Sequence, residues 1–70
     1  MANRIPRNAK KLECTTLIDT LACKAGTTYT AEKTENGWIA NINGEVYSLF
    51  LAFLRDANCC KIIIKEESLW

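Results

Sequence analysis

The clearest pattern of hydrophobic and polar positions lies between two Asn-Gly pairs, Asn36-Gly37 and Asn43-Gly44. Within residues 38–42, Trp, Ala and Ile alternate with Ile and Asn, which is the period of a β-strand. Asn-Gly suits a tight hairpin turn because both residues tolerate a positive φ angle. Residues 27–33 are rich in Thr and Tyr, which are favoured in strands. The sequence therefore predicts an antiparallel hairpin over residues 28–42 that turns at Asn36-Gly37.

Apolar residues before this hairpin recur at the spacing of a helix. The spacing predicts a helix over residues 9–24, with Gly26 at a position where glycine commonly ends a helix. Thr15-Thr16 does not suit a helix interior, because β-branched side chains lose rotamer freedom there. A short strand over residues 11–17, followed by a helix from Asp19, is therefore a competing interpretation.

After the hairpin, apolar residues from Val46 to Ala57 trace a second helical face, and residues 60–65 alternate as a strand with Ile63 on its outer face. These elements predict an α+β domain in the order helix, strand, strand, helix, strand. Both helices would pack on one face of an antiparallel or mixed sheet of three strands, or of four if residues 45–48 add a short one. The predicted core collects the inward-facing residues, namely Leu17, Ile18, Leu21, Trp38, Ile42, Leu49, Phe50, Phe53, Ile62 and Ile64.

The length and composition predict a single globular domain. The chain has 70 residues, of which 49% are hydrophobic and 24% are charged, and these fractions are ordinary for a globular protein. The longest apolar run, residues 49–54, is far shorter than the ~20 residues of a membrane-spanning helix. The basic N-terminus lacks the apolar stretch of a secretory signal. We therefore expect a cytoplasmic protein with no membrane span.

The formal net charge of +1 conceals an uneven distribution. The first eleven residues contain four basic residues and no acid, whereas residues 12–70 contain five basic and eight acidic residues, a net charge of −3. The four basic residues are Arg4, Arg7, Lys10 and Lys11. We expect residues 1–8 to form a flexible basic arm and residues 9–70 to form one α+β domain. Such an arm can contact phosphates, which makes nucleic acid a candidate partner.

The cysteines Cys14, Cys23, Cys59 and Cys60 form no Cys-x-x-Cys pair, and the chain has no His. We therefore expect reduced thiols, with a disulfide or a metal site as alternatives and a redox or metal-responsive switch at Cys59-Cys60 as a further one. The commonest general base is missing, and no clear partner activates a Cys nucleophile. These observations predict a protein that is not an enzyme and that uses no cofactor and no metal.

Three apolar residues fall outside the inward faces of the predicted elements: Leu51, Ile63 and Trp70. Aromatic and aliphatic anchors dominate the energetics of protein interfaces, so we expect these residues to bind a partner. The leading hypothesis is a non-catalytic interaction protein that binds and modulates a larger protein or self-associates as a homodimer. Small domains of this kind are often inhibitors or regulators encoded by phages and other mobile elements. The alternative is a small nucleic-acid-binding regulator that uses the basic arm.

Overall fold

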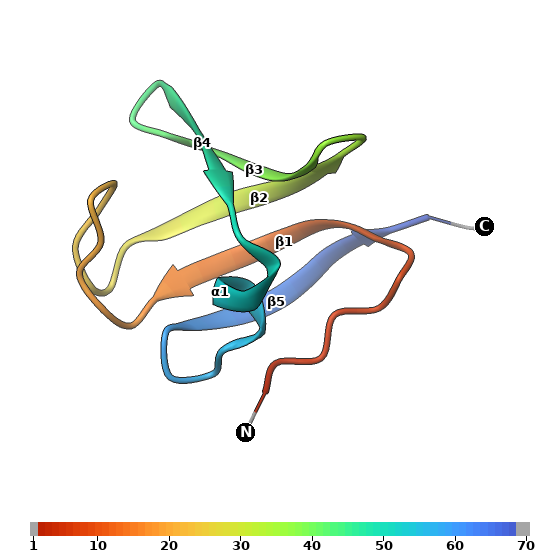
Figure 1. Ribbon diagram of the computed structural model, residues 1–70, viewed down its shortest axis with the longest axis horizontal. Coiled ribbons are helices and arrows are strands. Elements are labelled where there is room, and N and C mark those ends of the chain that lie inside the picture. The colour runs from red at the N-terminus through yellow and green to blue at the C-terminus, as the bar shows by residue number, and fades with distance from the viewer. Residues whose placement is uncertain (1, 69–70) are drawn as a thin grey trace.

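The structure is a computed structural model that describes residues 2–68 and contains a five-stranded antiparallel sheet with one short helix (Figure 1). The strands are β1 (Ala9–Thr16), β2 (Thr28–Thr34), β3 (Gly37–Ile42), β4 (Glu45–Leu49) and β5 (Cys60–Glu67), and the helix is α1 (Leu51–Arg55). The strand order is β4-β3-β2-β1-β5. The first four strands therefore form a meander, and β5 returns to pair antiparallel with β1.

The predicted α+β class with two helices is wrong, first of all in the N-terminal part of the sheet. Residues expected in a helix over 9–24 instead form β1 and a long connection, residues 17–27, that contains no helix. Leu12, Cys14 and Thr16 are fully buried and alternate with less buried residues, which is the period of a strand. The competing strand over 11–17 lies close to β1, but the helix from Asp19 that accompanied it is not formed.

The second predicted helix is also wrong over most of its length. Residues 45–49 form β4, so the optional short strand at 45–48 is confirmed, and only Leu51–Arg55 are helical. Tyr47 and Leu49 pack towards the core and Val46 faces the other side, so alternation overrides the helical spacing. No side chain caps the start of α1 at Phe50, which is consistent with a helix of little more than one turn.

The two Asn-Gly pairs form different turns. The predicted hairpin over 28–42 is confirmed, but its turn lies at Glu35-Asn36, because Thr34 and Gly37 face each other across the two strands. Gly37 follows the turn with a φ of +116°, which favours glycine strongly. In the second hairpin Asn43 and Gly44 are the central residues, with φ angles of +54° and +86°. Positive φ at both positions is the signature of a type I′ turn.

The core lies on one face of the sheet, beneath α1. Its buried apolar residues are Ala9, Leu12, Cys14, Tyr29, Ala31, Trp38, Ala40, Ile42 and Leu54. Of the predicted core, Trp38 and Ile42 are confirmed as buried, and Leu49, Phe53, Ile62 and Ile64 pack partly buried against this cluster. The remaining four are exposed, so their prediction is wrong: Leu17, Ile18, Leu21 and Phe50.

The N-terminal segment, residues 2–8, runs from α1 towards the start of β1 (Figure 1) and contacts α1, the start of β5 and Ser68. The side-chain amide of Asn3 donates to the carbonyl oxygens of Leu54 and Cys60, each at 2.9 Å. Ile5 packs against the core cluster, and the side-chain amide of Asn8 donates to the carbonyl oxygen of Ser68. The flexibility expected for residues 1–8 stays a prediction. No helix in the described part of the chain is long and apolar enough to cross a membrane.

Candidate functional site

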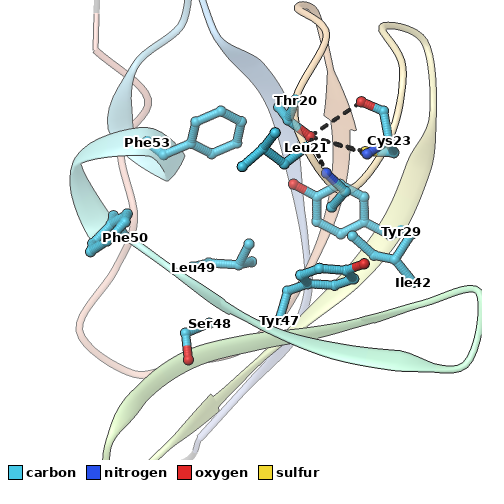
Figure 2. A pocket seen from close by; sticks show the side chains of 11 residues that line it. Thr20, Leu21, Cys23, Tyr29, Ile42, Tyr47, Ser48, Leu49, Phe50 and Phe53 are labelled. Carbon is cyan, nitrogen blue, oxygen red and sulfur yellow. Dashed lines mark hydrogen bonds between the residues drawn. The ribbon is translucent and has the colours of Figure 1, made fainter.

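A cleft of about 340 Å³ lies between three segments, and we call it the apolar cleft (Figure 2). The long connection contributes residues 20–23, β4 contributes residues 47–49, and the start of the helix contributes Phe50 and Phe53. Tyr29 of β2 and Ile42 of β3 line it from the core. The cleft thus brings together segments that are far apart in the sequence.

A side-chain turn centred on Thr20 shapes the wall formed by the long connection. The Thr20 hydroxyl oxygen accepts hydrogen bonds from the backbone N–H groups of Ala22 and Cys23, each at 3.2 Å. The Thr20 hydroxyl also donates to the carbonyl oxygen of Cys23. The backbone N–H of Thr20 donates to the same oxygen at 2.8 Å. Thr side chains commonly stabilise such turns. This turn holds Leu21 at its tip, where the side chain is fully exposed.

Two polar side chains that line the apolar cleft are engaged within the protein. The Thr20 hydroxyl is used in its own turn, and the Tyr47 hydroxyl donates to a Glu45 carboxylate oxygen at 2.7 Å. The described residues that line the cleft include no charged side chain. Phe50, 80% exposed, and Leu21 stand at the cleft as its most exposed apolar side chains. The site is therefore suited to bind apolar side chains.

The predicted partner-binding residues do not gather at this cleft. Leu51 lines a different hollow, together with Pro6 of the N-terminal segment and Trp38 of β3. Ile63 lies between Ile62 and Ile64, which pack against the core, so its side chain is on the opposite face of the sheet. Leu51 and Ile63 are both exposed, but they do not share a surface. Trp70 lies outside the described residues.

The basic residues predicted for nucleic-acid binding are all exposed, but they differ in their surroundings. The Lys11 ammonium pairs with Glu32 at 3.8 Å and with Glu66 at 3.6 Å, so two carboxylates offset its charge. Arg7 instead lies in the hollow beside Leu51, which Lys33 and Arg55 also line. Arg4 and Lys10 are the other two basic residues predicted for nucleic-acid binding.

The four cysteines are free thiols, and two of them, Cys14 and Cys60, are buried. Burial, and then the neighbouring Cys60, raise the pKa of the Cys14 thiol to about 12. The pKa of Cys59 is raised by partial burial and then by its hydrogen bond with Asp56. A raised pKa keeps a thiol protonated and weakly nucleophilic at neutral pH. Among residues 2–68, no group of three potential ligands could hold a metal ion.

Comparison with models of protein families, with curated proteins and with solved structures gave no significant match. The site is therefore interpreted from its own chemistry. Sequence reasoning missed the apolar cleft because it assigned Leu21 and Phe50 to the core. The signal that could have located it is the stretch between Thr16 and Thr28, which is rich in exposed apolar residues and too long for a tight turn.

Proposed function

We propose that the protein is a non-catalytic interaction module that binds an apolar segment of a larger partner protein in the apolar cleft. One observation carries this proposal: Leu21 and Phe50 are exposed at the mouth of a cleft whose described lining contains no charged side chain. Contiguous exposed apolar surface on a small domain commonly marks an interaction site. Modulation of the partner, as by an inhibitor or regulator encoded by a mobile element, is the further expectation within this proposal.

The expected energetics make the proposal testable with single substitutions. Burying a Leu or Phe side chain contributes about 1.5–3 kcal/mol, which corresponds to about ten- to hundredfold in affinity. Removing Leu21 or Phe50 should leave the fold intact, because neither side chain belongs to the buried cluster. Binding and stability are therefore separable at these two positions.

The experiment selects peptides from a random displayed library against the wild-type protein and measures their affinities by fluorescence anisotropy. Leu21→Ser and Phe50→Ser should each weaken binding by about tenfold or more. Val46→Ser is the matched control, since Val46 is 64% exposed and does not line the cleft. It should change affinity less than twofold. Selected peptides that bind both cleft variants as tightly as the wild type would contradict the proposal.

Nucleic-acid binding is the second candidate function, and one cluster favours it. Arg7, Lys33 and Arg55 line the same hollow, whose described lining contains no acidic residue. The test measures affinity for a fluorescent DNA duplex at about 50 and 200 mM salt, because phosphate contacts weaken steeply with salt. Replacing Arg7 and Arg55 by Glu should abolish such binding. Affinity that ignores both salt and these charges would eliminate this candidate.

A further inference from the structure

One side of the apolar cleft is a free strand edge. β4 is the terminal strand of the sheet, hydrogen-bonded to β3 alone in the strand order. Tyr47 and Leu49 point their side chains towards the cleft and the core. The Ser48 hydroxyl points away from the other side chains of the cleft in Figure 2. Ser48 is nevertheless among the residues that line the cleft.

The ladder between β3 and β4 defines which backbone groups of β4 are free. Ile42 and Glu45 flank the two-residue turn, and the first and fourth residues of such a turn share a hydrogen bond. Hydrogen-bonded and non-hydrogen-bonded pairs alternate along an antiparallel ladder. The backbone N–H and C=O groups of Val46 and Ser48 therefore point to the free edge. They lie beside the apolar cleft and can pair with another strand.

We infer that the apolar cleft binds an extended segment of the partner as an added antiparallel strand on β4. This inference rests on the proposed function and specifies its mode. Side chains that alternate along the added strand would enter the cleft opposite Leu49 and Tyr47. Opposite Glu45, the only charged residue of β4, a basic side chain is complementary. Read from its N-terminus, the partner segment is apolar, any residue, apolar, any residue, basic.

Three features that commonly block edge pairing, namely Lys, Pro and a β-bulge, are missing from β4, whose one charged residue is Glu45. Its five residues, Glu45–Leu49, include no Lys and no Pro, and their pairing with β3 runs without a register shift. Edge strands that must stay unpaired commonly carry such residues or a β-bulge. An added strand is antiparallel by preference, because every pairing in this sheet is antiparallel and parallel pairing is slightly less stable.

The test uses a fluorescent, end-blocked peptide, Ser-Val-Thr-Val-Thr-Lys-Ser, whose two Val and Lys follow the inferred order. Both Thr residues of the peptide would place their amides opposite Ser48 and Val46. N-methylation of these two amides should weaken binding by about tenfold or more, because two hydrogen bonds and the close approach of the strands are lost. Replacing the peptide Lys by Glu should also weaken binding, and less so at high salt.

The matched protein variants are Ser48→Pro and Ser48→Ala. Proline removes the outward N–H without taking a hydrogen bond from β3, whereas alanine keeps it. Ser48→Pro should lose about two- to tenfold in affinity and Ser48→Ala none, with melting curves to confirm that both fold. Amide exchange should slow at Val46 and Ser48 on peptide binding. If Ser48→Pro unfolds, the affinities of the parent and N-methylated peptides for the wild-type protein still test the added strand.

Each outcome separates the added strand from the proposed function. Equal affinity of the parent and N-methylated peptides would overturn the added strand. Failure of the designed peptide, while library peptides still need Leu21 and Phe50, would overturn the added strand and leave the cleft as a binding site. Library peptides that ignore both residues would overturn the proposed function itself.

Discussion

β4 and β5 both end the sheet, but they differ in protection. β5 carries two lysines, Lys61 and Lys65, and its pairing with β1 has two register shifts, whereas the pairing of β4 with β3 has none. Lys11 of β1 lies opposite Glu66, whereas the next residue, Leu12, lies opposite Ile64. This shift leaves Lys65 as an extra residue, which is the arrangement of a β-bulge. Bulges and edge lysines discourage pairing with another chain.

The two edges differ in how strongly each would attract another strand if it were left unprotected. The centre of β5 is Ile62-Ile63-Ile64, a run with high β-propensity that would attract another strand if it were left unprotected. Its ion pair between Lys65 and Glu13, at 3.4 Å, is exposed, so it adds about 0–1 kcal/mol to stability. We therefore expect the lysines of β5 to act mainly against association with another chain. β4 has no lysine, and it is the edge that borders the apolar cleft.

The largest effect expected from this comparison is a loss of stability on the β5 side. Leu12 is fully buried and lies opposite Ile64 of β5, so Leu12→Ala should cost about 2–5 kcal/mol, much of the stability of a small domain. Val46→Ala on β4 should change stability by no more than about 0.5 kcal/mol, because Val46 is mostly exposed. Urea unfolding of both variants checks the prediction, and similar losses would show that the two edges are anchored alike.

A smaller effect is expected at the turns. Gly44→Val should cost about 1–2 kcal/mol, because Gly44 has a φ of +86° and a β-branched residue resists positive φ. Gly37→Val, at a φ of +116°, should also cost more than about 1 kcal/mol. The two variants should differ in amide exchange, because the Gly44 turn holds β4, which has no second neighbouring strand. A Gly44→Val protein as stable and as protected as its parent would refute this.

The smallest effect on stability, and the most specific for the comparison, comes from removing the lysines of β5. Replacing Lys61 and Lys65 together by Val should change the free energy of unfolding little, since both side chains are on the surface. The variant should instead associate as its concentration rises, which light scattering measures. A matched pair of Thr substitutions preserves β-propensity with a polar side chain. A lysine-free β5 that stays monomeric would show that the bulge alone protects this edge.

The hairpin over residues 28–42 could be predicted from the sequence because local signals agree there, although its turn lies one residue earlier than predicted. The alternation of Trp38, Ala40 and Ile42 and the nearby Asn-Gly pairs all favour strands and turns, and no distant contact is needed to choose. In β1 the apolar spacing fits a helix and a strand equally well. Leu12 and Cys14 become strand residues because β2 and β5 pair on either side of them, and β5 is far away in the sequence. Pairing with β2 and β5 therefore determined that this segment is a strand, which its local periodicity did not.

The apolar cleft could not be predicted for a related reason. Leu21 and Phe50 fall in the core only if both segments are helices, and each becomes exposed once its segment is a loop or the end of a strand. Because a helical period was assigned to segments that are not helical, the two proposed binding residues were predicted to be buried. The free edge of β4 could not be predicted either, because a strand lies at a sheet edge by virtue of the strand order and not of its own sequence.

The pairing of β1 with β5 also affects how the chain matures during synthesis. The side-chain amide of Asn3 donates to the carbonyl oxygen of Leu54, which lies 51 positions later in the chain. At the usual rate of translation the N-terminal segment waits about 3–10 s before its partners have been made. Throughout that interval β1 lacks one neighbouring strand and Leu12 lacks part of its cover. The nascent chain is therefore prone to misassociation until β5 has been made, and chaperones have the most to shield before that point.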